Sequence, residues 1–139
     1  MKVCLDTNIF ISVKNKETDS SYCELILDAI DENQIQAAIS TIVLAEVLVG
    51  FYQNKEIHEA EQFLNHAISK YQIIPVNVEI SNKAALLRGT QQIKLPDALI
   101  SATATYIKAD FLITKDFPLI KRIKYQIITP QKFTEDYLV

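Results

Sequence analysis

The amino-acid sequence predicts an α/β fold, a three-layer α/β/α sandwich around a parallel sheet of four or five strands. Two observations lead to this fold class. Short apolar runs of strand length are separated by segments with helical spacing or helix-capping signals. The runs are apolar almost throughout, which is typical of strands that helices cover on both faces. With 139 residues, we expect one domain, residues 1–139, whose core needs neither a disulfide nor a structural metal.

Five apolar runs are the expected strands. Asp6 directly follows the first run, and the third run contains Pro75, which favours the end of a strand. The runs span 3–5, 35–39, 73–76, 111–114 and 126–129. In open parallel sheets, binding sites lie beyond the carboxyl ends of the strands, where the strand order reverses. Polar residues that directly follow these runs are therefore candidates for a functional site.

Helix signals separate the runs. Ser21 and Glu24 form a capping box, in which side chains satisfy backbone N–H groups of the first turn. Gly50 and Gly89 are placed to end two helices, and Pro96 suits the first turn of another. The expected helices span 22–32, 41–49 (after a cap at 40 or 41), 56–71, 78–88 and 97–108.

Composition excludes several classes of protein. No apolar run approaches the ~20 residues that a membrane span needs, and a charge follows the N-terminus too soon for a signal peptide. Two glycines do not suffice for a Gly-rich phosphate loop. Cys4 and Cys23 lack the spacing of a metal or redox motif and suit a reducing compartment. We therefore expect a cytoplasmic protein with no membrane segment.

Charge is distributed unevenly along the chain. The net charge is −3, but residues 1–80 hold 12 acidic and 5 basic residues, whereas residues 81–139 hold 5 acidic and 9 basic ones. This asymmetry permits a basic strip beside an acidic centre. The bases expected in such a strip are Lys115, Lys121, Arg122 and Lys124.

Four acids occupy apolar surroundings. Asp6 and Asp116 follow the first and fourth strands, Asp97 lies in the first turn of an apolar helix, and Glu46 interrupts an apolar helix. Taken singly, Asp6, Asp97 and Asp116 also suit helix caps or turns. Together they indicate a pocket, because an ionised carboxylate is costly to bury unless it is paired or binds a metal. Hard oxygen ligands suit Mg²⁺ or Mn²⁺, and the chemistry that follows is metal-assisted hydrolysis of a phosphate ester.

The segments around these acids resemble the motifs of the PIN-domain ribonucleases. D-T-N at 6–8 resembles the opening D-T/S-N motif, and 40–46 is similar to S-x-x-x-x-x-E. Residues 97–104 are similar to D-x-x-I-A-A-T-A, and 114–117 resembles a shortened T-x-D-x-D-F. The likeness covers nearly the whole chain in the family's order. Within the family, the chain most resembles the VapC-type toxins of toxin–antitoxin pairs.

The resemblance implies a Mg²⁺- or Mn²⁺-dependent endoribonuclease. Asp6, Glu46, Asp97 and Asp116 would be its catalytic and metal-binding residues. Asp6 and Asp97 would be the principal ligands, and Glu46 would hold a water or a second ion. The family often has two acids in its fourth motif, whereas this chain has Asp116 alone.

The resemblance also implies neighbours and partners. Thr7, Asn8 and Thr114 would orient the carboxylates, and Arg88 matches a basic residue near the site. The expected partners are an RNA substrate, a second copy in a homodimer and a cognate antitoxin. The antitoxin would insert a basic residue among the acids and lay an amphipathic helix in an apolar groove. We expect that groove beside the helices that follow Ser21 and Ser40.

Of the other functions considered, three lack residues that they need and two remain as alternatives. A haloacid-dehalogenase-type phosphotransferase needs a second Asp where Asn8 stands, and a receiver domain needs an adjacent acidic pair near its start. A serine or cysteine hydrolase needs a placed histidine, whereas His58 and His66 lie on one expected surface helix. A PIN-fold RNA-binding or assembly module without catalysis, or another Mg²⁺-dependent phosphoesterase, would also fit the sequence.

Overall fold

The structure of the chain is a computed structural model that describes residues 1–123 and 126–138. Five parallel strands form one sheet in the order β3-β2-β1-β4-β5. Their bounds are β1 Lys2–Leu5, β2 Gln36–Ser40, β3 Gln72–Ile74, β4 Phe111–Ile113 and β5 Ile127–Ile128. The predicted α/β fold with a parallel sheet is therefore confirmed.

The register of the sheet places the ends of β1 and β4 together. Leu5 pairs with Ile113, and the N–H of Asp6 donates to the carbonyl of Ile113 at 3.1 Å. The chain crosses from β1 to β2 and β3 on one side, whereas β4 and β5 lie on the other. The strand order thus reverses between β1 and β4, and a site of an open parallel sheet is expected at this point.

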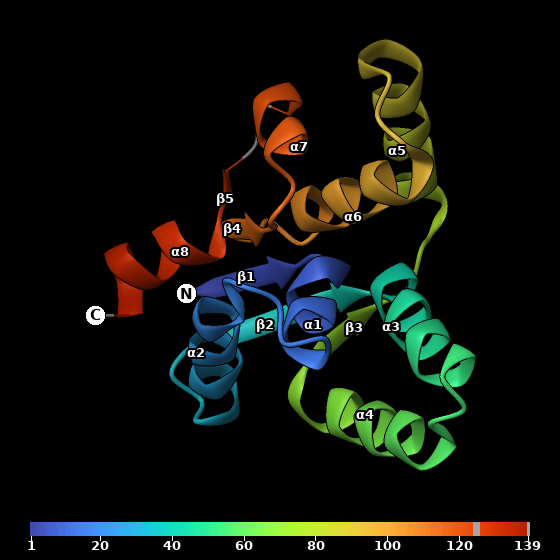
Figure 1. Ribbon diagram of the computed structural model, residues 1–139. Coiled ribbons are helices and arrows are strands. Elements are labelled where there is room, and N and C mark those ends of the chain that lie inside the picture. Colours follow the sequence, from blue (N-terminus) through green and yellow to red (C-terminus); the bar gives the residue numbers. More distant parts are fainter. Residues whose placement is uncertain (124–125, 139) are drawn as a thin grey trace.

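Helices cover both faces of the sheet (Figure 1). Helices α5, α6 and α7 lie above it in the view of Figure 1, and α1, α2 and α4 lie below. One buried cluster joins β2 and β3 to α5, α6 and α7, and a larger one joins the sheet to α1, α2, α3, α4, α8 and a second side of α6. The bounds are α1 Thr7–Lys14, α2 Ser20–Asp31, α3 Thr41–Gln53, α4 Ile57–Lys70, α5 Val78–Gln91, α6 Leu95–Tyr106, α7 Phe117–Arg122 and α8 Pro130–Phe133, before a π-helical turn, η1, at Thr134–Leu138.

The structure adds helices that the sequence does not predict. Helices α1 and α7 begin directly after Asp6 and Asp116, whose side chains accept hydrogen bonds from backbone N–H groups of the first turn. The two acids therefore act as N-caps as well as site candidates. Helix α1 is short and half of its 8 residues are β-branched, and α7 has only 6 residues, so both give a weak sequence signal.

Three predicted helix ends are wrong. Gly50 and Gly89 lie inside α3 and α5, which end near Asn54 and Gln92 instead. Gln92 itself takes the left-handed conformation, with a φ of 56°, so a glycine is favoured but not required at that position. Helix α2 begins at Ser20 rather than at Tyr22. The predicted capping box is absent because the N-cap is Asp19, whose carboxylate pairs with Lys115 at 2.7 Å instead of capping the helix.

Within the described residues, none of the helices combines the length and the apolar character needed to cross a membrane.

Candidate active site

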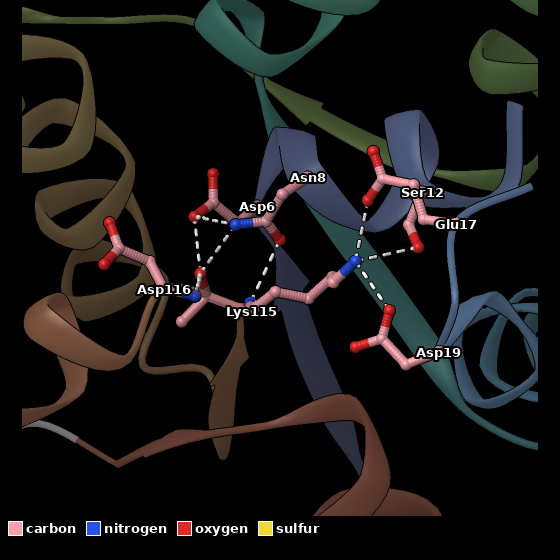
Figure 2. Close-up of polar contacts among 8 residues, drawn as sticks. Asp6, Asn8, Ser12, Glu17, Asp19, Lys115 and Asp116 are labelled. Atoms are coloured by element: carbon pink, nitrogen blue, oxygen red, sulfur yellow. Dashed lines mark hydrogen bonds and ion pairs between the residues drawn. The ribbon is translucent and has the colours of Figure 1, made fainter. Parts of the chain in front are cut away.

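Asp6 is the most enclosed of the four acids of the candidate site. It lies at the end of β1 and is only 5% exposed. Its Oδ1 accepts a hydrogen bond from the N–H of Thr7 at 2.7 Å, and its Oδ2 accepts one from the hydroxyl of Thr114 at 2.7 Å. The amide of Asn8 donates to Oδ2 as well, at 3.3 Å. Both oxygens are therefore fixed in direction by groups from the ends of β1 and β4, and Figure 2 shows the bonds to Oδ2.

Thr114 connects this carboxylate to the other side of the site. Its hydroxyl donates to Asp6 and accepts from the amide of Asn8 and from the N–H of Asp116, both at 3.0 Å. A hydroxyl has one donor and two acceptor sites, so this buried group is fully used. Asn8 also accepts from the N–H of Lys115 at 3.1 Å. The expectation that Asn8 and Thr114 orient the carboxylate is met by these bonds.

Glu46 reaches the site from α3. Its Oε1 accepts a hydrogen bond from the hydroxyl of Thr7 at 2.6 Å, so Thr7 contacts two of the four acids. The sequence suggests a buried glutamate, which is wrong, because Glu46 is exposed. Val43 and Val47 on the same helix are buried, whereas Val49 and Tyr52 are about half exposed, so the apolar pattern of α3 does not mark a fully buried helix in the single chain.

Asp97 lies in the first turn of α6, and Asp116 is the N-cap of α7. Asp116 accepts a hydrogen bond from the N–H of Leu119 at 3.2 Å. Asp97 is partly buried, and its carboxylate makes no hydrogen bond or ion pair with another described residue. Asp116 and Glu46 both raise the pKa of Asp97 through their negative charges, so the fold brings these acids within electrostatic range.

The pKa values of Asp6 and Asp97 are shifted by burial and by the neighbouring acids. Burial raises the pKa of Asp6 to about 6, and the charges of Asp97 and Glu46 add to the rise, whereas the bonds from Thr114 and Thr7 oppose it. Burial is also the main cause of the raised pKa of Asp97, ahead of the two acids and against the opposing charge of Lys94. Carboxylates that raise one another's pKa values attract a cation.

The donor set fits a hydrated divalent cation but not a closed cage. Within residues 1–123 and 126–138, no three acidic, His or Cys side chains converge closely enough to hold an ion by themselves. Mg²⁺ usually takes one or two carboxylates and keeps several waters, so full convergence is not required. The oxygens of Asp6 are already oriented, and the carboxylate of Asp97 accepts no hydrogen bond from the described residues. The expectation that Asp6 and Asp97 are the principal ligands is compatible with these contacts and stays a prediction.

Lys115 has a different environment from the one that the sequence predicts. Its ammonium contacts Ser12 at 3.0 Å, Glu17 at 2.8 Å and Asp19 at 2.7 Å, and its side chain is 18% exposed. Figure 2 shows the side chain extending from the end of β4 to the connection between α1 and α2. The prediction that Lys115 flanks the site as a base for RNA is therefore wrong, because acids of the chain already bind its charge.

The other predicted bases are distributed as follows. Arg122 lies at the end of α7 and lines a pocket next to Asp97 and Asp116. Lys121 is exposed on the same helix, and Arg88 donates to the carbonyl of Ile93 at 3.3 Å. Lys124 lies outside the described residues. Sequence reasoning missed Lys94, which lines the same pocket as Arg122, although its place just before Pro96 and Asp97 is a signal for it.

The comparisons with known proteins agree with this fold. The PIN domain model matches residues 3–124. Ribonuclease VapC2 of Rickettsia felis is 30% identical over 134 residues, which are 89% of this chain and 93% of that protein.

Two solved structures are similar over most of the chain. A toxin–antitoxin complex from Klebsiella pneumoniae is 30% identical with a TM-score of 0.72, covering 92% of this chain and 97% of that chain. VapBC2 from Rickettsia felis bound to a DNA fragment from its promoter is also 30% identical with a TM-score of 0.72. The match covers 93% of this chain and 98% of that chain. From the match of the family model and these similarities, the chain belongs to the PIN-domain family.

Proposed function

We propose that the protein is a metal-dependent endoribonuclease and the toxin of a VapBC-type toxin–antitoxin pair. The observation that carries the proposal is the group of Asp6, Glu46, Asp97 and Asp116 at the point where the strand order reverses. The similarity to Ribonuclease VapC2 and to toxin–antitoxin complexes supports RNA as the substrate and an antitoxin as the partner.

The residues of the chain divide the work of such a reaction. Asp6 and Asp97 would hold the ion, and Asp116 would help from the start of α7. When bound, Mg²⁺ or Mn²⁺ makes water a better nucleophile and offsets the charge that develops on the leaving oxygen. Glu46, held by Thr7 at 2.6 Å, would orient the attacking water. Thr114 and Asn8 keep the carboxylate of Asp6 in one direction, so that little reorganisation is needed when the ion binds.

Cleavage of a labelled single-stranded RNA in Mn²⁺ tests the assignment. Asp6→Asn and Asp97→Asn should each abolish cleavage, whereas the matched control Asp28→Asn, an exposed position on α2, should cleave as the parent does. If Asp6→Asn cleaves RNA as fast as the parent, the assigned pocket is wrong. A parent that binds RNA without cleaving it in any divalent metal would favour a binding module instead.

An apolar groove supports the antitoxin part of the proposal. It has a volume of about 300 Å³ and lies among α1, α2, α3 and α4. Its apolar lining is Phe10, Val13, Leu27, Val47, Phe51, Phe63 and Tyr71. Its location beside α2 and α3 agrees with the groove expected from the sequence. An amphipathic helix fits a groove of this kind, and Phe63→Glu should weaken antitoxin binding while RNA cleavage continues.

Exposed apolar residues support the homodimer. Val49 and Tyr52 on α3 and Leu86 on α5 are between 50% and 64% exposed, and a second copy would remove them from water. Light scattering of the parent at micromolar concentration should give a dimer, and Val49→Glu should shift it toward the monomer. A parent that is monomeric throughout this range would contradict the proposal.

A further inference from the structure

A second pocket adjoins the acidic residues on the side of α6 and α7. It has a volume of about 290 Å³. Asp97 and Asp116 line it, together with Lys94, Arg122 and Gln92. Ile93, Pro118 and Leu119 complete the lining with apolar surface. The pocket therefore combines the two acids of the candidate site with two bases and an apolar patch.

The two bases of this pocket differ from Lys115 in their ion pairs. Lys115 pairs with the carboxylates of Glu17 at 2.8 Å and Asp19 at 2.7 Å. Among the described residues, neither Lys94 nor Arg122 has such a partner. The charge of Lys94 still acts on Asp97, where it opposes the rise in pKa. These positive charges are thus directed at the pocket but are not neutralised there by an ion pair.

The segment that carries Lys94 is fixed by two guanidinium groups. Arg122 donates to the carbonyl of Gln92, and Arg88 donates to the carbonyl of Ile93, both at 3.3 Å. Gln92 takes the left-handed conformation and ends α5. The backbone just before Lys94 is therefore bonded to Arg122, although the side chains of Lys94 and Arg122 are exposed.

We propose that this pocket binds the nucleotide next to the scissile bond of an RNA strand, with Lys94 and Arg122 contacting its phosphate. The inference rests on the proposed function, because the acids beside the pocket are those assigned to cleavage. A phosphodiester supplies the negative charge that the two bases lack, and an apolar patch beside it suits a ribose or base. Asp97 and Asp116 line the same pocket and repel an anion, so the phosphate needs the positive charges of the two bases to bind there.

Salt dependence of RNA binding tests the contacts without relying on cleavage. A labelled single-stranded RNA is bound to Asp6→Asn protein over a range of KCl concentrations, alone and combined with Lys94→Ala or Arg122→Ala. Each base variant should weaken binding about tenfold and reduce the slope of log affinity against log salt by about 0.7, the value for one lost contact to a single strand. The control Lys132→Ala, whose base pairs with Asp136 on the C-terminal segment, should leave the slope unchanged.

Steady-state cleavage by otherwise unaltered protein gives a second readout. Lys94→Ala should raise KM with little change in kcat, and Lys94→Arg should restore KM because it keeps the charge. Arg122→Lys keeps the positive charge but loses the guanidinium bond to the carbonyl of Gln92. A KM close to that of the parent in this variant would assign the effect of Arg122 to its charge. If the parent cleaves RNA but both alanine variants match Lys132→Ala in slope and KM, this inference fails and the proposed function stands. If the parent neither binds nor cleaves RNA, the proposed function itself fails.

Discussion

The two sides of the acidic site are built differently. At the ends of β1 and β4, Asp6 is buried and both of its oxygens accept hydrogen bonds. At the starts of α6 and α7, Asp97 is partly open, and its carboxylate has no hydrogen-bond partner among the described residues. The side at β1 and β4, called the fixed side, has its carboxylate oriented by hydrogen bonds within the protein. The side at α6 and α7, called the open side, has a carboxylate whose oxygens are available to a ligand.

This difference separates two kinds of residue. The Thr114 network orients groups of the chain, so its loss should reduce stability first. Lys94 and Arg122 face a pocket, so their loss should reduce substrate binding and leave stability nearly unchanged. The following experiments test whether the two sides behave in these separate ways.

The largest effect on stability is expected at the fixed side. Thr114→Val keeps the shape of the side chain but removes a hydroxyl that makes three hydrogen bonds. Because Thr114 is fully buried, the groups left without a partner should lower the free energy of unfolding by about 2–3 kcal/mol. Urea unfolding measures this change. The control Thr90→Val removes an exposed hydroxyl from α5, and equal losses in the two variants would contradict the distinction.

Much of this fixed side follows from the sequence. The apolar runs predict the strands, and parallel strands bring Asp6 and Asp116 to one edge of the sheet. The D-T-N segment and Thr114 carry the orienting groups, because they lie next to the acids in the chain. Local sequence and strand order therefore sufficed to predict that these residues meet.

The remaining contacts could not be predicted because they depend on distant segments. Lys115 meets Glu17, a residue 98 positions earlier, through the packing of a connection that has no sequence signal. Lys94 and Arg122 come together only because α5, α6 and α7 pack around Gln92. Charge counts along the chain do not distinguish Lys115 from Arg122. In the fold, Lys115 pairs with Glu17 and Asp19, whereas Arg122 lines a pocket.

Stability should depend on pH in opposite ways with and without metal. The pKa of Asp6 is about 6 in the folded protein, above the ordinary value of 3.8, so the folded state binds this proton more tightly. The metal-free protein should therefore lose stability as pH rises from about 4 to 6. A metal needs the carboxylate, so stabilisation by Mn²⁺ should be larger at pH 7 than at pH 5. Thermal unfolding at both pH values measures each trend.

The variant Asp6→Asn is the reference for this experiment. It removes the titrating group, so both pH trends should become smaller than in the parent. An unchanged trend would show that Asp97 or another group, rather than Asp6, causes the dependence. The fixed side would then be less important for metal binding than its geometry indicates.

Lys115 should behave as a positioning residue. Lys115→Met removes three contacts of a partly buried side chain and leaves Glu17 and Asp19 without their partner. We expect a loss of about 1–2 kcal/mol in the free energy of unfolding and a roughly tenfold fall in kcat, because the segment before Asp116 is less well held. The salt slope of RNA binding should not change. A reduced slope would show that Lys115 contacts RNA after all, while Lys132→Met controls for the loss of one exposed charge.

The smallest effect is expected at the end of α5, near the open side. Gly89 lies inside the helix without a positive φ, and an added Cβ would meet no atom within 4 Å. Gly89→Ala should therefore stabilise the protein by about 0.5–1 kcal/mol, because alanine loses less backbone freedom on folding. The bonds from Arg88 and Arg122 already fix the segment after α5, so KM for RNA should stay as in the parent. A raised KM in this variant, with the expected gain in urea resistance, would instead show that the pocket needs a flexible α5 to admit its nucleotide.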